Sequence, residues 1–300
     1  MSNKLRLGTR GSKLALIQAD IVSKKLFELD NTLSIDIIPI QTEGDINTTQ
    51  PLHEIGGKGV FIKSLEHALI KGEVDAAIHS VKDITSTIAN NTELVSFLTP
   101  EARTDCVICH DPIHFNNLKE LPLGYSFATS SLRRKAILLS IRPDFIIKDI
   151  RGNVQTRIEK CKSGYADALL LSTAGVIRLG MNDDISLELS PTEFTPAPGQ
   201  GVIGIQLMKN NSLFRDLFLN IGCDLQRERH FYEHMLVSKV GLDCNYPLGV
   251  YVCVNDGIVT MRVCWATLDC KHFYSQTITG DKKSMFMQID NLVEKIKKDI

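Results

Sequence analysis

The sequence lacks an excess of either charge sign, since 34 lysines and arginines face 35 aspartates and glutamates for a net charge of −1. A general nucleic-acid binder needs a positive field, so this balance argues against that class and confines any basic site to a local patch. The sequence also has no apolar run long enough to cross a bilayer, and its start, MSNKLRLGTR, lacks the apolar segment of a signal peptide. We therefore expect a cytoplasmic protein with neither a membrane nor a nucleic acid as partner.

A disulfide framework is a further expected absence, although the chain has eight cysteines, because the cytosol keeps thiols reduced. Cys106, Cys109 and His110 have the spacing of a c-type haem attachment site. That attachment normally goes with export, and no second cysteine pair with zinc spacing follows. We favour a buried strand with the polar flanks Asp105 and Asp111, and we expect no metal site.

The stretch from Gly72 to Asp83, GEVDAAIHSVKD, is the centre of the predicted fold. Residues 76–78 form a short apolar run, typical of a parallel strand buried on both faces. In open α/β sheets ligands bind beyond the carboxyl ends of the strands, so Lys82 and Asp83 are candidates for chemistry. A charged surface turn explains this stretch alone equally well.

The N-terminal segment is predicted as a strand over residues 4–8 and a helix that buries Leu14, Ile17, Ile21 and Leu26, with Ser12 or Thr9 as its cap. Arg10 between them indicates an anion site, because free backbone N–H groups and a guanidinium meet there. A solvent-facing arginine beside a simple cap is the alternative. A strand over 34–41, a glycine-rich ligand loop over 43–59 and a helix over 60–71 follow.

The order of elements repeats in the second half of the chain. Strands are predicted over 125–128 and 145–150, helices over 132–141 and 154–162, and residues 164–170 repeat the pattern of 72–78. We therefore predict an α/β fold with two similar lobes and a cleft between them. The Pro- and Gly-rich segment 195–204 is predicted as a hinge or as a close approach to a ligand. Helices over 220–240 and 284–298 and a hairpin at Asn255-Asp256-Gly257 predict a small α+β domain at the C-terminus.

Five arginines of the second lobe are expected at strand ends or in the first turns of helices: Arg133, Arg134, Arg151, Arg157 and Arg178. Cations at a helix N-terminus oppose its dipole and need a compensating partner. Guanidinium forks suit carboxylates and phosphates, so we infer a small polyanion; solvated arginines are the alternative. Cys244, which lies in a loop, is a nucleophile, a metal ligand or neither.

These stretches together resemble the porphobilinogen deaminase family. The matching pieces are RLGTRGSKLALIQ, GGKGVFIKSLEHAL, DAAIHSVKD, ATSSLRRKA, RGNVQTR, STAGVIRLG, PAPGQGVIGI and CNYPLG, in the family's order. The resemblance implies two lobes of the periplasmic-binding-protein type with a central cleft and a C-terminal α+β domain. It places residues 1–100 and 201–219 in lobe 1, residues 101–200 in lobe 2 and residues 220–300 in the C-terminal domain.

The resemblance also implies a monomeric transferase that condenses four porphobilinogen molecules head to tail and releases ammonia each time. The product is the linear tetrapyrrole hydroxymethylbilane, built on a dipyrromethane cofactor that a thioether joins to Cys244. Asp83 is then the catalytic carboxylate, which stabilises a cationic azafulvene. Cofactor contacts are implied for Lys82, Asp83, Ser131, Arg133 and Arg134, and substrate contacts for Arg10, Arg151, Arg157, Arg178 and Gln200. Phe61 is expected to contact the substrate by stacking on a pyrrole ring, and a core aromatic is the alternative.

Two alternatives remain. A non-catalytic two-lobed binding protein for a small polycarboxylate explains the cleft and the arginines, but it does not need Asp83 and a loop thiol together. A different thiol-dependent transferase predicts a free Cys244.

Overall fold

The computed structural model describes residues 4–41, 59–111, 113–241 and 246–300. The chain divides into two compact units, Met1–Pro100 with Val202–Glu228 and Glu101–Gly201 with Arg229–Ile300. The second unit holds both the second lobe and the C-terminal segment. The division into three domains that the resemblance implies therefore stays a prediction.

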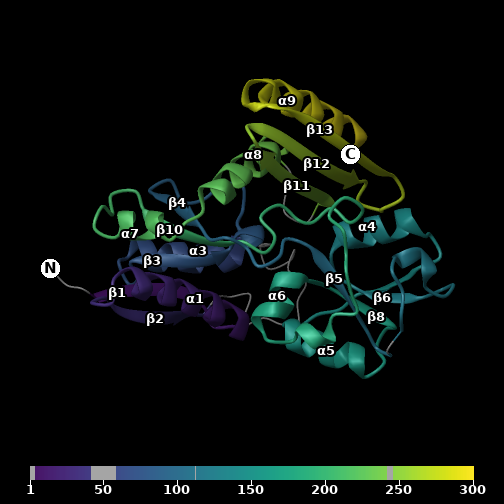
Figure 1. The fold of residues 1–300 in the computed structure, drawn as a ribbon, viewed down its shortest axis with the longest axis horizontal. Coiled ribbons are helices and arrows are strands. Elements are labelled where there is room, and N and C mark those ends of the chain that lie inside the picture. Colours follow the sequence, from purple (N-terminus) through teal and green to yellow (C-terminus); the bar gives the residue numbers. More distant parts are fainter. Residues whose placement is uncertain (1–3, 42–58, 112, 242–245) are drawn as a thin grey trace. The chain divides into compact units, whose positions relative to one another are not determined.

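A five-stranded mixed sheet forms the centre of the first unit (Figure 1). Its strands in spatial order are β2 (Ser34–Ile40), β1 (Lys4–Arg10), β3 (Ala76–Ser80), β10 (Ile203–Met208) and β4 (Thr92–Phe97). β1 is parallel to β2 and β3, whereas β10 is antiparallel to both of its neighbours. The chain thus returns to this sheet late in the sequence, which no local pattern predicts.

The second unit contains a sheet with the same plan. Its strands in spatial order are β7 (Ile146–Lys148), β6 (Ser126–Ala128), β8 (Ala168–Ser172), β5 (Asp105–Cys109) and β9 (Leu187–Glu188). β6 is parallel to β7 and β8, and β5 is antiparallel to β8 and β9. The two sheets agree in order and direction, which confirms the predicted α/β fold with two lobes of similar build.

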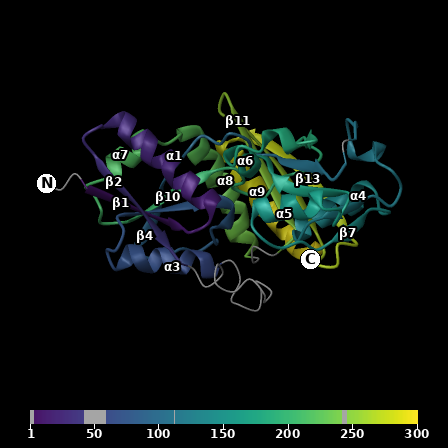
Figure 2. The same ribbon diagram turned by 90° about the horizontal axis from the view of Figure 1, so that it is seen from below.

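Helices follow the parallel strands in both lobes. The first lobe has α1 (Lys13–Leu29), α3 (Gly59–Ile70), a 3-10 turn (Val81–Asp83) and α7 (Arg215–Asn220), and the second has α4 (Leu132–Ile141), α5 (Val154–Lys162) and α6 (Thr173–Arg178). Figure 2 shows α1 and α3 on opposite faces of the first sheet. Both faces are therefore covered, which is why the middle strands are continuously apolar.

The buried face of α1 differs from the prediction. Leu26 is buried as expected, but Leu14, Ile17 and Ile21 are only half-buried. The helix instead packs through Ala15, Gln18, Ala19, Val22 and Leu26. Small alanines on this face let the helix approach the sheet closely, and the larger residues flank the contact.

Two aspartates brace corresponding positions of the two lobes. Asp75, just before β3, accepts hydrogen bonds from the backbone N and the guanidinium of Arg6 at 2.7–3.1 Å. Asp167, just before β8, accepts from the backbone N and the hydroxyl of Ser126 at 2.7 and 2.6 Å. The repeated sequence pattern thus encodes a repeated strand-pairing contact.

The C-terminal segment forms an antiparallel meander of β11 (Leu248–Asn255), β12 (Ile258–Ala266) and β13 (Phe273–Asp281). The helices α8 (Asp224–Val240) and α9 (Lys282–Asp299) contribute side chains to its core around the fully buried Trp265. The predicted hairpin is present: Asp256 and Gly257 have φ values of 48° and 76°, the conformation of a tight two-residue turn. No helix in the described ranges is both long and apolar enough to cross a membrane.

Candidate functional site

The carboxyl ends of β1 and β3 open onto one cavity in the first lobe. Its volume is about 80 Å³, and Arg10 and Ser12 line it from one strand end while His79, Ser80 and Asp83 line it from the other. Ser12 caps α1 by accepting the Ala15 backbone N–H at 3.3 Å, which turns the chain directly after Arg10. The fold therefore brings Arg10 and Asp83, two predicted site residues, to the same cavity.

Asp83 ends the 3-10 turn that follows β3. Its half-buried carboxylate makes no hydrogen bond with any residue in the described part of the chain. The structural aspartates of this lobe are bonded, as Asp75 is to Arg6. A carboxylate held at a cavity without such a partner is suited to accept hydrogen bonds from a ligand or to stabilise a cation.

Gln18 and Ser80 form a reciprocal pair at the same cavity. The Gln18 Nε2 lies 2.9 Å from the Ser80 Oγ, and the Ser80 Oγ lies 3.0 Å from the Gln18 Oε1. Gln18 is almost fully buried. The sequence analysis missed Gln18 because a polar residue inside a helix carries no signal until its face is known.

His79 is hydrogen-bonded to the neighbouring strand β10. Its Nε2 lies 2.9 Å from the Oε1 of Gln206, a residue of β10 that is itself fully buried. Burial lowers the pKa of His79 to about 4, although the hydrogen bond with Gln206 and the charge of Asp83 act in the opposite direction. The imidazole is therefore neutral near pH 7.

The second lobe buries two of its predicted arginines against an aspartate. Arg133 donates to the Asp105 Oδ2 at 2.8 Å, and Arg134 donates to the Oδ1 through Nε and Nη2 at 2.9 and 2.6 Å. Burial by itself raises the pKa of Asp105, but the two guanidiniums outweigh it and hold the pKa at about 2. Asp105, expected as a polar flank, is fully buried. The sequence predicted a polar residue here, but an apolar run does not show that this residue is buried in a charge pair.

The compensating partner that we inferred for these arginines is thus supplied by the chain itself. Arg133 also donates to the Thr195 carbonyl at 2.8 Å, and Arg134 also donates to the Leu170 carbonyl at 2.9 Å. Ser131 caps the same helix by accepting from the Arg134 backbone N at 3.4 Å. Any contact of these three residues with a cofactor stays a prediction.

Arg157 differs from the buried pair. Its Nε donates to the Gly152 carbonyl at 2.7 Å, but its terminal nitrogens make no hydrogen bond within the described residues. Burial and the neighbouring Arg134 lower its pKa, while Asp149 raises it and Arg151 lowers it again. Burial and the two neighbouring arginines thus disfavour the charged form of Arg157, and a bound anion would offset both effects.

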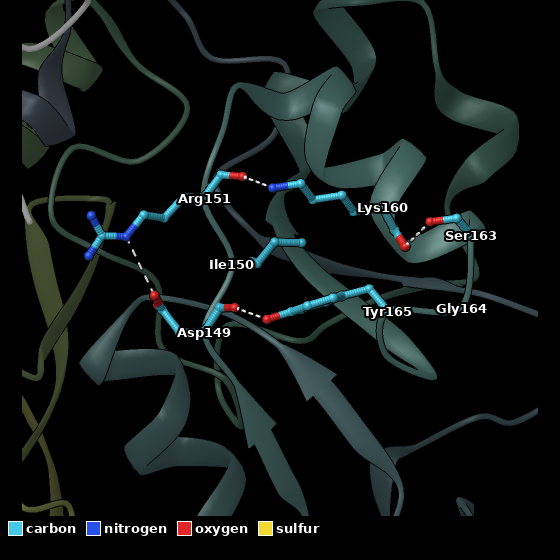
Figure 3. A pocket seen from close by; sticks show the side chains of 7 residues that line it. All are labelled: Asp149, Ile150, Arg151, Lys160, Ser163, Gly164 and Tyr165. Carbon is cyan, nitrogen blue, oxygen red and sulfur yellow. Dashed lines mark hydrogen bonds and ion pairs between the residues drawn. The ribbon is translucent and has the colours of Figure 1, made fainter. Parts of the chain in front are cut away.

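A cavity of about 320 Å³ lies beside the loop that carries Arg151 (Figure 3). Arg151 is half-exposed, with its Nε 3.5 Å from Asp149. Most polar groups in Figure 3 bond to backbone carbonyls: Lys160 to that of Arg151 at 3.2 Å, and Tyr165 to that of Asp149 at 2.5 Å. The side chains around this cavity therefore hold the 149–152 loop in place.

Arg178 and Gln200 each hold part of the segment 195–204 by hydrogen bonds. Arg178 donates to Glu101 and to the Gly201 carbonyl, both at 2.6 Å, while its buried Nε has no partner in the structure as described. The Gln200 amide donates to the Thr104 carbonyl at 2.9 Å and is buried. Gly201 has a φ of 80°, and a Cβ there would lie 1.9 Å from the Ala102 oxygen, so only glycine fits.

Several predictions fall on parts that are not described. Cys244 and the loop over 43–59, apart from Gly59, lie outside the described residues, and so does the side chain of Phe61, although its backbone belongs to α3. Lys82 is half-buried in the turn before Asp83. The described part of the chain contains no cluster of three or more residues that could hold a metal ion.

The cysteine pair that resembled a haem site lies in β5, as the strand interpretation predicted. Both thiols are free and buried, and burial raises the pKa of Cys106 to about 12. A thiol that stays protonated in an apolar core is chemically inert.

Comparison with known families identifies the chain. A family model described as porphobilinogen deaminase, dipyromethane cofactor binding domain, matches residues 5–216. This match covers most of the chain, including the cavity of the first lobe and the arginines of the second. The chain belongs to the porphobilinogen deaminase family.

Solved structures with a similar fold include periplasmic binding proteins. One is a TRAP solute binding protein from Desulfovibrio salexigens, with 12% identity over 79% of this chain and 76% of that chain and a TM-score of 0.44. Another is the methionine binding protein MetQ, with 11% identity over 79% and 96% and a TM-score of 0.45. A third is the VFT2 domain of Bordetella pertussis BvgS, with 16% identity over 79% and 93% and a TM-score of 0.41.

The matched domain of the porphobilinogen deaminase family binds a dipyrromethane cofactor. Each unit, taken by itself, has residues that suit an acid-rich group of that kind. In the described ranges Arg157 makes no ion pair, and the buried Nε of Arg178 lacks a hydrogen-bond acceptor. The Asp83 carboxylate, which bonds to none of the described residues, can accept hydrogen bonds from ring N–H donors.

Proposed function

We propose that this protein is a hydroxymethylbilane synthase, which condenses four porphobilinogen molecules head to tail and releases ammonia at each step. The product is a linear tetrapyrrole for haem and related tetrapyrroles. A dipyrromethane group, when bound through a thioether to Cys244, supplies the primer on which the chain grows. The proposed enzyme acts as a cytoplasmic monomer.

The observation that carries the proposal is the Asp83 carboxylate, which has no hydrogen-bond partner in the described residues and lines a cavity with Arg10. Its position at the carboxyl end of β3 is where α/β folds place reacting groups. Membership of the porphobilinogen deaminase family supplies the reaction class.

Asp83 has a defined task in this reaction. The aminomethyl group of porphobilinogen reacts as its ammonium form: ammonia leaves with the electrons of the C–N bond, and the carbon becomes a cation conjugated with the pyrrole ring. The fixed carboxylate of Asp83 stabilises this charge and accepts hydrogen bonds from pyrrole N–H groups. A ring carbon of the growing chain then bonds to the cation and loses its proton, which Asp83 can pass to the departing ammonia.

The arginines bind the acids of the substrate and of the growing chain. Each porphobilinogen carries an acetate and a propionate, so every condensation adds negative charge. We assign Arg157, Arg151 and Arg178 of the second lobe and Arg10 of the first to these carboxylates, because guanidinium forks bind them bidentately. We propose further contacts with the cofactor or substrate for Gln200, Lys82, Phe61 and Ser131. Arg133 and Arg134 are proposed to contact the cofactor while they stay paired with Asp105.

Turnover of porphobilinogen tests the proposal directly. The purified protein is incubated with porphobilinogen, and the mixture is then acidified and oxidised so that any tetrapyrrole becomes a porphyrin. We expect porphyrin absorbance and release of ammonia. If neither porphyrin nor ammonia forms although the cofactor is attached, the proposed enzyme activity is rejected.

Intact mass separates the proposed enzyme from the two-lobed binding protein and from another thiol-dependent transferase. The enzyme requires a mass above the 33.4 kDa of the sequence by two linked pyrrole units. Cys244→Ser removes the addition. A binding protein, or an enzyme with a free thiol, shows the mass of the sequence alone.

A further inference from the structure

His79 belongs to a hydrogen-bond network in which every donor is assigned. Gln206 Nε2 donates to the Glu66 Oε1 at 2.9 Å and to the Thr92 Oγ1 at 2.7 Å. The Thr92 hydroxyl gives its own hydrogen to the Ala89 carbonyl at 2.7 Å, so it accepts from Gln206. Both amide hydrogens of Gln206 are therefore used, and its Oε1 is the atom that faces His79.

This network decides the tautomer of His79. An amide oxygen only accepts hydrogen bonds, so the His79 Nε2, 2.9 Å away, carries the ring hydrogen. In the neutral imidazole the other nitrogen, Nδ1, then presents a lone pair. Nδ1 has no hydrogen-bond partner in the described part of the chain and is not among its fully buried unpartnered atoms, and His79 lines the same cavity as Asp83.

We propose that the Nδ1 of His79 is a second acceptor for the pyrrole N–H groups of the substrate or growing chain, beside the carboxylate of Asp83. This inference rests on the proposed function and adds a residue to its site. The rest of the cavity suits a flat ring with an N–H donor, because Ile62, Leu65 and Ile78 form apolar walls.

A neutral acceptor has an advantage over a second carboxylate at this position. Two neighbouring carboxylates repel each other, so one of them takes up a proton and the pair loses its full charge. The charged groups around His79 are Asp83 on the next turn, Arg10 in the same cavity and Glu66 behind Gln206. Burial keeps His79 uncharged, which leaves Asp83 fully available to stabilise a cation.

Two variants separate the two ring nitrogens. His79→Gln places an amide near the position of Nε2 and can still donate to Gln206, but it removes the acceptor at Nδ1. His79→Asn places an amide oxygen near Nδ1 and loses the bond with Gln206. With porphobilinogen as substrate, we expect kcat to fall about tenfold or more for His79→Gln at an unchanged thermal midpoint.

His79→Asn should show the opposite pattern, a lower thermal midpoint with part of the turnover per folded molecule regained. If His79→Gln turns over as fast as the natural protein, or if His79→Asn is the slower of the two per folded molecule, the inference is overturned. If the natural protein itself forms no tetrapyrrole, the proposed function fails instead.

The tautomer is measured independently of activity. The ¹⁵N shifts of the His79 ring at pH 7 should show a hydrogen on Nε2 and none on Nδ1, and the Nδ1 signal should move when porphobilinogen is added. A hydrogen on Nδ1 in the free protein would exclude the acceptor role.

Discussion

At the scale of single residues, arginines that look alike in the sequence have different tasks. Arg133 and Arg134 are buried against Asp105 and support the fold of the second lobe. Arg157 has no such partner in the described residues, and its surroundings lower its pKa. A residue whose charge the described chain leaves uncompensated keeps its full binding capacity for a ligand.

Asp105→Asn and Arg157→Gln should therefore act on different properties. Removing the Asp105 charge leaves two buried guanidiniums unpaired, and we expect a loss of about 3–5 kcal/mol in the free energy of unfolding. Arg157→Gln should leave this free energy unchanged or slightly higher while it raises the KM for porphobilinogen. Urea unfolding and steady-state kinetics measure the two effects, and equal destabilisation by both variants would contradict the assignment.

Asp83→Asn should lower turnover about 100-fold or more, because the fixed negative charge beside the developing cation is lost. The thermal midpoint should stay the same, since the Asp83 carboxylate bonds to no described residue. Asp75→Asn is the matched control: Asp75 pairs with Arg6, so its loss lowers stability without a comparable loss of turnover per folded molecule. Full activity of Asp83→Asn would remove it from the reaction.

At the scale of elements, the same strand-and-turn unit occurs in both lobes with different contents. β3 leads into the turn that carries Asp83, and β8 leads into α6, which ends at Arg178. The repeat thus provides one scaffold twice, with the carboxylate on one copy and a buried arginine on the other. The segment before β10 connects the two lobes and passes through Gly201.

Gly201→Ala tests how tightly this connection is built. A residue with a side chain at positive φ costs roughly 1–2 kcal/mol by itself. At Gly201 the new Cβ also meets the Ala102 oxygen at 1.9 Å, so we expect a larger loss in the free energy of unfolding. Gly180→Ala is the control, because Gly180 has a φ of 69° but open space around it. Similar losses in urea unfolding for the two variants would show that the close contact relaxes.

At the scale of the whole molecule, two buried groups determine part of the response to acid. The pKa of His79 is about 4 in the folded protein against 6.5 in an exposed histidine, so the unfolded chain binds the extra proton between these values. His79 leaves the free energy of unfolding unchanged above pH 6.5 and lowers it as the pH drops towards 4, by up to about 3 kcal/mol. Asp105, whose pKa falls to about 2, keeps its contribution above pH 3.8 and loses it only in stronger acid.

Urea unfolding at pH 7.5, 5.5 and 4.5 measures this dependence. We expect the free energy of unfolding to decrease across the series and to decrease less for His79→Gln, which has no group to titrate there. His230, with a pKa lowered by burial to about 3, contributes in the same direction and remains in both proteins. Parallel curves for the two proteins would contradict a buried neutral His79.

The sequence by itself determined the local features of this protein. Apolar runs and helix periods located most elements: α4 and α5 have their predicted bounds, whereas β7 is shorter than its apolar pattern. The motifs also pointed to the family and to Asp83, because a few neighbouring residues carry that information. The face of α1 was predicted one residue out of register, since burial depends on what the helix packs against.

Only the tertiary structure decided which polar groups meet. His79 and Gln206 are 127 positions apart, and Arg134 and Asp105 are 29 apart, yet each pair is in direct contact. Such contacts depend on strand order, above all on the antiparallel insertion of β10 and β5 into the two sheets. A pattern along the chain shows which residues can carry a charge, but the free energy of that charge depends on partners that topology brings from distant parts of the chain.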